Sequence, residues 1–139
     1  MNIFRLVGEI MHKGVLACQP QTPMGEVVRV LSDSEHHTLV VVDAHGELLG
    51  ILSHMDVLPY YGQDLQNYQA KDVMTPRSEI CVVTPSMPIA EAVRLMAERR
   101  IHHLVVTEEG SDGLRPVGIV STADIIREMR GSRWIWLLE

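Results

Sequence analysis

The chain has few aromatic residues, few cysteines and no long apolar run. Aromatic residues make up 4% of its 139 residues, and its two cysteines are Cys18 and Cys81. Two cysteines without a C-x-x-C spacing are too few for a disulfide scaffold, so a reducing, cytoplasmic location is expected. The start carries no basic segment followed by an apolar one, and no uncharged apolar stretch is long enough for a membrane helix. Neither export nor membrane spanning is therefore expected.

Basic residues are also in the minority. The chain has 12 Lys and Arg against 18 Asp and Glu, a net charge of -6. Because a negative chain repels a polyanion, nucleic acid is not an expected partner. The chain does contain 46% hydrophobic residues, enough for a core. Its length suits one compact domain or two small ones.

The sequence repeats itself. Residues 26–42 align with residues 91–107 with seven identities in seventeen positions, and the run GILSHMD at 50–56 aligns with GIVSTAD at 118–124. Cys18 aligns with Cys81, so the cysteines are interpreted as equivalent positions of the two copies. These alignments predict a first repeat over 8–62, a connector over 63–71, a second repeat over 72–131 and a C-terminal tail over 132–139.

The two ends of the chain flank this duplication. Met1–Ile10 is expected to belong to neither copy. The tail holds both tryptophans, Trp134 and Trp136. It is expected either to pack back on the fold or to form an oligomer contact, because Trp is enriched at interfaces.

Each repeat predicts the element order β-α-β-β-α. Pro23 and Pro88 each precede apolar residues at helical spacing. The segments Thr38–Asp43 and His103–Thr107 are rich in Val and Leu without alternation, which is typical of strands covered on both faces. A long turn is expected at Glu108–Arg115. One repeat of about 60 residues is too small to bury both faces of its helices, so the copies are expected to share a core.

Both copies place Ser at a strand-to-helix junction and Asp three residues later, as Ser53 with Asp56 and Ser121 with Asp124. One interpretation is a capping box at the helix start. The other is a nucleotide site, because a helix N-terminus suits a phosphate and a carboxylate accepts both hydroxyls of a ribose. The residues alone leave both interpretations open.

With Asp72-Val-Met-Thr-Pro76, Ile101-His-His-Leu-Val-Val106 and the two Gly-Ile-x-Ser-x-x-Asp runs, the chain resembles a pair of CBS domains, the tandem unit called a Bateman module. The resemblance covers about residues 8–131. It implies an α/β (α+β) fold of two β-α-β-β-α units packed sheet to sheet about a pseudo-twofold axis, with two clefts between them. It also implies a stand-alone regulatory module that binds AMP, ADP, ATP or S-adenosylmethionine and transmits this to a partner protein.

The resemblance also implies which residues line the clefts. A basic residue at the entry to a strand reaches the ligand's phosphates in the family, and the adenine ring needs an apolar slot. Thr75–Cys81 is expected to face Asp56, and Val15–Cys18 to face Asp124. The expected ligand contacts are Ala17, Cys18, His37, Ile51, Ser53, Asp56, Thr75, Ile80, Cys81, His102, His103, Ile119, Ser121, Thr122 and Asp124.

The two clefts are expected to differ. The first copy has Met11-His12-Lys13 where the second has Met74-Thr75-Pro76. The scarcity of basic residues favours a ligand with few phosphates. A metal site built from His36, His37, His102 and His103 is a weaker alternative, because adjacent side chains on a strand point to opposite faces.

No catalytic function and no required cofactor are expected. The serines lie outside a G-x-S-x-G sequence, and a catalytic triad would not be expected in two copies. The rival interpretation is a ligand-free dimerising interaction module. A homodimer is expected in either case, and Val27, Leu31, Val93 and Met96 are candidates for its interface or for the core.

Overall fold

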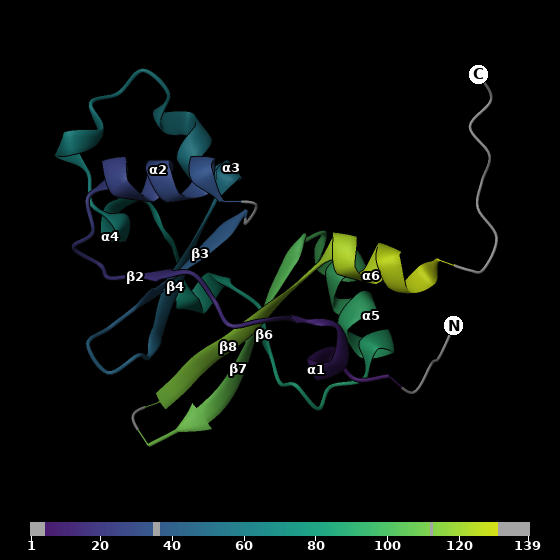
Figure 1. Cartoon of the computed structure of the whole chain (residues 1–139). Coiled ribbons are helices and arrows are strands. Elements are labelled where there is room, and N and C mark those ends of the chain that lie inside the picture. Colours follow the sequence, from purple (N-terminus) through teal and green to yellow (C-terminus); the bar gives the residue numbers. More distant parts are fainter. Residues whose placement is uncertain (1–4, 35–36, 112, 131–139) are drawn as a thin grey trace, which may run out of the picture.

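The computed structural model describes residues 5–34, 37–111 and 113–130, which form two similar halves side by side (Figure 1). The first half of the sequence contains α1 (Val7–Ile10), β1 (His12–Lys13), β2 (Ala17–Cys18), α2 (Met24–Asp33), β3 (Thr38–Val42), β4 (Leu48–Ser53) and α3 (His54–Val57). The second contains α4 (Ala70–Val73), β5 (Thr75–Pro76), β6 (Val82–Val83), α5 (Ile89–Arg99), β7 (His103–Gly110), β8 (Gly113–Ser121) and α6 (Thr122–Met129). Short 3-10 turns lie at Leu58–Tyr60, Leu65–Asn67 and Arg77–Glu79.

The described strands form two four-stranded sheets that exchange their edge strands. One sheet has the order β2-β3-β4-β5 and the other β1-β8-β7-β6. Strand β5, from the second repeat, pairs with β4 of the first, and β1, from the first repeat, pairs with β8 of the second. Each repeat therefore completes the sheet of the other, and the two copies are interlocked.

Helix α1 belongs to the duplication, contrary to expectation. It precedes β1 as α4 precedes β5, and both Val7 and Ala70 are fully buried. Val7 packs in the core of the second half, and Ala70 in that of the first. The expectation that Met1–Ile10 belongs to neither copy is wrong for residues 7–10. A four-residue helix is too short to reveal a helical period in the sequence.

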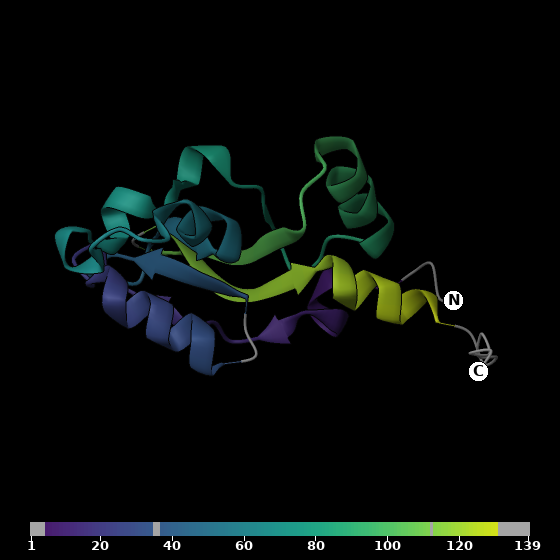
Figure 2. The same cartoon turned by 90° about the horizontal axis from the view of Figure 1, so that it is seen from above.

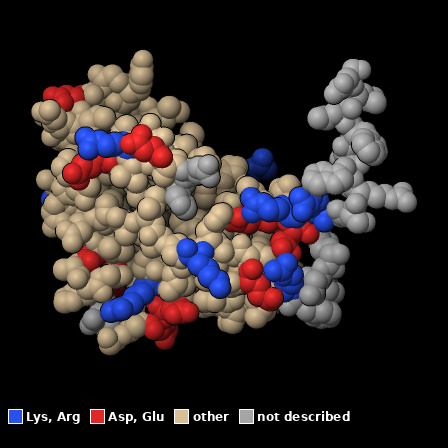
Figure 3. All heavy atoms as spheres, in the orientation of Figure 1, with Lys and Arg blue, Asp and Glu red and all other residues tan. Residues whose placement is uncertain are grey.

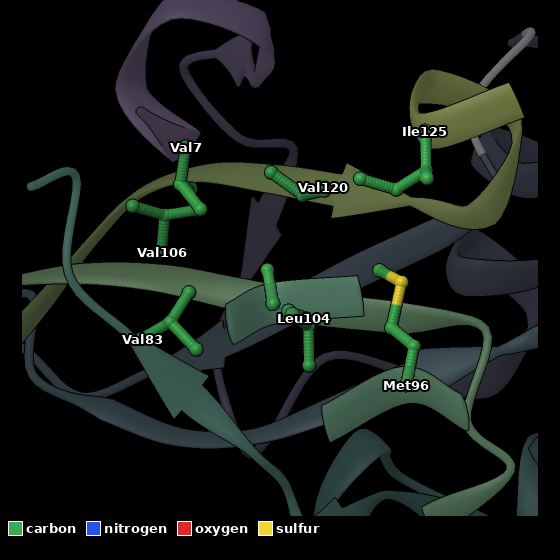
Figure 4. Packing of buried hydrophobic residues seen from close by; sticks show 8 residues of the cluster. Val7, Val83, Met96, Leu104, Val106, Val120 and Ile125 are labelled. Atoms are coloured by element: carbon green, nitrogen blue, oxygen red, sulfur yellow. The ribbon is translucent and has the colours of Figure 1, made fainter. Parts of the chain in front are cut away.

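Each half has its own hydrophobic core. Helix α2 buries Met24, Val27 and Leu31, and α5 buries Ala92 and Met96. Both helices begin directly after the proline that predicted them, Pro23 or Pro88. Figure 4 shows the core of the second half, where side chains from α1, β6, β7, β8, α5 and α6 meet.

A third cluster packs the two sheets together. Its buried members are Val40, Leu48 and Val105, with Ile51 and Ile119 partly buried against them. These pairs are equivalent in the duplication: Val40 matches Val105, and Ile51 matches Ile119. The α+β fold of two sheet-packed units is thus confirmed. The expected sharing of one core holds only for this third cluster, because each half also has a core of its own. Figure 2 shows α2 and α5 on opposite sides of the joined sheets.

The second hairpin is longer than predicted. Strands β7 and β8 stay paired as far as Gly110 opposite Gly113, so the expected long turn at Glu108–Arg115 is wrong. Within this segment Glu108 lies opposite Arg115, and such opposite-charge pairs favour continued pairing. The tail with Trp134 and Trp136 lies outside the described residues.

Candidate functional site

Two clefts of similar size lie between the halves. The one named here the Asp124 cleft has a volume of about 470 Å³, and the Asp56 cleft about 440 Å³. Neither aspartate is itself among the lining residues; each lies behind the wall and contacts side chains that do line it. The Asp124 cleft is lined by His12, Gly14, Val15, Leu16, His37, Thr38, His103, Ile119, Ser121, Ala123 and Arg127. The Asp56 cleft is lined by His37, Ile51, Ser53, His54, Met55, Thr75, Glu79, Ile80, Cys81, Arg100, Ile101, His102, His103 and Val105.

The two clefts are formed by equivalent residues of the two repeats. Ile51 and Ser53 line one, as Ile119 and Ser121 line the other. The exchanged edge strands deliver one polar side chain to each: Thr75 from β5, and His12 from β1. In both cases the opening segment of one repeat faces the Ser-x-x-Asp run of the other.

The Asp56 carboxylate is held from two elements. Its Oδ2 accepts hydrogen bonds from the backbone N–H of Ser53 at 2.8 Å and from the Ser53 hydroxyl at 3.0 Å. Its Oδ1 accepts one from the Thr75 hydroxyl at 2.6 Å. A carboxylate offers about four acceptor positions. Among the described residues three are used, and one position on Oδ1 stays open.

The Asp124 carboxylate has the same bonds to its serine and different partners on the other oxygen. Its Oδ2 accepts from the backbone N–H and hydroxyl of Ser121 at 2.8 and 3.0 Å. Its Oδ1 lies 3.0 Å from Nη1 of Arg127 and 3.2 Å from Nε2 of His12. The Asp124 side chain is 1% exposed, so the Arg127 guanidinium compensates a buried charge.

Ala17 and Cys18 do not line the Asp124 cleft; they lie on a separate groove with Thr22, Glu26 and residues of α2. The reason is the strand register. Ala17 pairs with Val40 and Cys18 with Val41, whereas Val82 and Val83 take the corresponding places in the second half. The interpretation of Cys18 and Cys81 as equivalent is therefore wrong by two residues, because the turn at Arg77–Glu79 lengthens the second copy.

The residues in register with Ile80 and Cys81 are Val15 and Leu16, and these do line the Asp124 cleft. Thr122 is also outside both clefts. It faces the groove between α5 and α6, and its backbone N–H donates to the carbonyl of His102. Burial raises the pKa of the Cys18 thiol, which keeps this side chain protonated and inert.

Histidines gather where the clefts meet. His37 and His103 line both clefts, His54 and His102 line the Asp56 cleft, and the rings of His37 and His54 stack edge to face at 4.9 Å. Burial, with the neighbouring His102 and His37, lowers the pKa of His103, and Asp124 opposes this. His36 lies outside the described residues. Among the residues described, no three His, Cys, Asp or Glu side chains are placed to hold a metal ion.

Sequence reasoning missed two basic residues beside Asp124. Arg127 follows Asp124 by three residues, a spacing that puts both on one helix face and so could have been noticed. His12 is the counterpart of Thr75 in the duplication, but its contact with Asp124 depends on the strand exchange. Neither was among the expected contacts.

Comparison with known proteins agrees with this geometry. The CBS domain profile matches residues 7–62 and 70–131. The chain belongs to the CBS domain family. The uncharacterized protein MJ0188 of Methanocaldococcus jannaschii is 32% identical over 121 residues, which are 87% of this chain and 43% of that protein. The chain thus spans less than half the length of this curated relative.

Two solved CBS structures share the fold. The CBS domain pair of MJ0100, in complex with 5'-methylthioadenosine and S-adenosylmethionine, has a TM-score of 0.79 and 25% identity, with 91% of this chain and 96% of that one covered. CBSX2 in complex with AMP has a TM-score of 0.76 and 26% identity, with 90% and 96% covered. Within the described part of this CBS pair, no helix combines the length and apolar character needed to cross a bilayer.

Proposed function

We propose that this CBS pair is a regulatory module that binds an adenosine-containing ligand in the clefts between its repeats. The observation that carries the proposal is the duplicated site: a carboxylate at a helix start, joined to an edge strand of the other repeat, beside an apolar wall. That its structural neighbours MJ0100 and CBSX2 are solved with S-adenosylmethionine, 5'-methylthioadenosine or AMP supports the choice of ligand.

The parts of the ligand have matching partners in the Asp56 cleft. Ile51, Ile80 and Cys81 form an apolar slot of the kind an adenine ring needs. The open acceptor position on Asp56 suits a ribose hydroxyl. His102 and His103 line the same cleft and would contact a phosphate or a carboxylate of the ligand. In the other cleft, Val15, Leu16 and Ile119 would form the corresponding apolar slot.

Charge favours a ligand with few phosphates. Figure 3 shows acidic and basic side chains interspersed on one face of the molecule, and the whole chain has a net charge of -6. A phosphate must therefore be held by local groups rather than by a general positive field. AMP and S-adenosylmethionine suit the clefts better than ATP.

The experiment is a titration of the full chain with AMP, ADP, ATP and S-adenosylmethionine, followed by thermal unfolding and calorimetry. A ligand at 100 times its Kd stabilises the folded state by ~2.7 kcal/mol. We expect at least one of the four to raise the melting temperature and to release binding heat. If none does at millimolar concentration, the ligand-binding function is wrong.

Binding of a phosphate ligand should tighten as the pH falls. The lowered pKa of His103 leaves its imidazole neutral at pH 7, and a bound phosphate would raise that pKa again. Binding then takes up a proton, so AMP affinity should rise as the pH falls below about 6.5. His102, His37, His54 and Asp124 act on the same imidazole. The measurement is calorimetry with AMP at pH 5.5 to 8; adenosine, without phosphate, and His103→Asn should both give a flatter profile.

A ligand-free dimerising module is the second candidate, and exposed apolar residues favour it. Of the expected interface residues, Val27, Leu31 and Met96 are buried in the cores, and Val93 is 37% exposed. Val93 lies on a groove of about 410 Å³ between α5 and α6, together with Ile126 and Met129.

We expect a homodimer that uses this groove. Ile126, 63% exposed, should be central to the contact. Ile126→Asp would bury an unpaired charge there and raise the dimer dissociation constant about tenfold or more. Light scattering over a concentration series measures this, and Gln66→Asp, an exposed change on a distant turn, should leave the dimer intact. A parent protein that is monomeric at high micromolar concentration would contradict the prediction.

A further inference from the structure

The carboxylates of the two clefts are not equally available to a ligand. Among the described residues, Asp56 receives three hydrogen bonds, and none of them comes from a cation. Asp124 receives two bonds from Ser121, and its other oxygen is contacted by Arg127 and His12. Oδ1 of Asp124 is therefore contacted by two nitrogen atoms, whereas Oδ1 of Asp56 accepts one hydrogen bond and has one position open.

The two side chains that cover Asp124 are themselves largely in solvent. The Arg127 side chain is 60% exposed and that of His12 58%, although the carboxylate they contact is 1% exposed. Each contact therefore joins a buried carboxylate to a side chain that reaches it from solvent, and a ligand hydroxyl can replace that side chain on the carboxylate. Arg127 and His12 also line the cleft, so an outward turn opens the carboxylate to whatever enters.

The duplication shows that this cover is particular to one cleft. At the position equivalent to His12 the other half has Thr75, and at the position equivalent to Arg127 it has Pro59. The Thr75 hydroxyl leaves a position of Asp56 open, and a proline has no group to reach it. The same fold thus carries a covered and an uncovered version of one site.

We infer that His12 and Arg127 form a displaceable cover on Asp124, so that a ligand fills the Asp56 cleft first and enters the Asp124 cleft only by displacing them. The inference rests on the proposed function, because it assumes that the carboxylates receive the ribose diol. The chain then has one ready site and one that responds at higher ligand concentration. The two clefts would therefore fill over two different ranges of ligand concentration, although both are built from the same motif.

The test uses adenosine, which carries the ribose diol but no phosphate. Removing the positive charge of Arg127 therefore cannot weaken binding through a lost attraction to a phosphate. Asp56→Asn disables the ready cleft and leaves the Asp124 cleft to be measured by calorimetry. In that background, Arg127→Ala and His12→Thr should each tighten adenosine binding about three- to tenfold, the size expected for removing one competing hydrogen-bonding contact. His12→Thr gives the Asp124 cleft the residue that its counterpart has.

The converse change is the matched control. Thr75→His in the parent chain should place a cover on Asp56 and weaken the tighter of the two sites. Melting curves without ligand confirm that each variant folds. If Arg127→Ala and His12→Thr bind adenosine equally or more weakly, the proposed cover is wrong. The proposed function is still supported in that case, provided that the parent chain binds the ligand. If the parent chain binds neither adenosine nor AMP, the proposed function itself is wrong and the inference falls with it.

Discussion

Asp56→Asn is expected to weaken binding of AMP or S-adenosylmethionine about 10- to 150-fold, equivalent to about 1.5–3 kcal/mol, the worth of a hydrogen bond to a charged group. The substitution keeps the size of the side chain. The amide oxygen can still accept both bonds from Ser53, and the amide NH2 in place of Oδ1 can donate to the Thr75 hydroxyl. What it removes is the negative charge that would hold the ribose diol. Stability without ligand should therefore stay within about 1 kcal/mol of the parent.

Two further substitutions separate ligand contact from helix capping. Asp72 caps the four-residue helix α4 by accepting from the backbone N–H of Gln69 at 2.9 Å, and neither Asp72 nor Gln69 lines a cleft, whereas the partners of Asp56 do. Asp72→Asn should therefore leave binding unchanged. Asp124→Asn should affect only the weaker site. If Asp56→Asn and Asp124→Asn both bind like the parent, the Ser-x-x-Asp runs are caps alone, and the dimerising module becomes the better account.

The fold could be predicted because the sequence is duplicated. The apolar residues at helical spacing after Pro23 recur after Pro88, and each helix is followed by a continuous apolar strand. The assignment of elements in one copy is therefore supported by the other. The copies then had to share a core, since neither is large enough alone. The cluster around Val40 and Val105 joins the two copies, although each half also has a core of its own.

The exchange of edge strands could not be predicted. Strands β1 and β5 contain two residues each, too few for a period of alternation, and nothing local says which sheet they join. For the same reason His12 could not be assigned to Asp124. Thr75 was placed beside Asp56 by resemblance to the family rather than by any pattern in its own residues.

The adenine slot shows how a small error in register changes a site. Aligning Cys18 with Cys81 put Ala17 and Cys18 into the cleft, whereas the strand pairing puts Val15 and Leu16 there. An identical residue is a tempting anchor for an alignment. The ladder of hydrogen bonds is the stronger constraint, because a shift along a strand moves every side chain to a new place.

The glycine that opens each Gly-Ile-x-Ser run is expected to be the most sensitive small residue in the chain. A Cβ on Gly50 would lie 2.6 Å from the carbonyl oxygen of Thr75, and one on Gly118 would lie 2.6 Å from that of His12. The obstacle is backbone of the exchanged edge strand, so no side chain can turn aside to make room. Gly50→Ala and Gly118→Ala should each lower the free energy of unfolding by about 1–3 kcal/mol, the usual cost of overpacking.

Denaturant unfolding of these variants has a matched control in Gly25→Ala. Gly25 lies in helix α2 with open space around its missing Cβ, so the change should raise stability by about 0.5–1 kcal/mol through helix propensity. Ligand binding should also change, because strand β5, which packs closely against Gly50, is the strand that brings the Thr75 hydroxyl to Asp56. Gly50→Ala should therefore weaken the tighter ligand site while Gly118→Ala alters only the weaker one. Unfolding free energies for Gly50→Ala and Gly118→Ala equal to that of the parent would mean that the edge strands do not lie as closely as the structure places them.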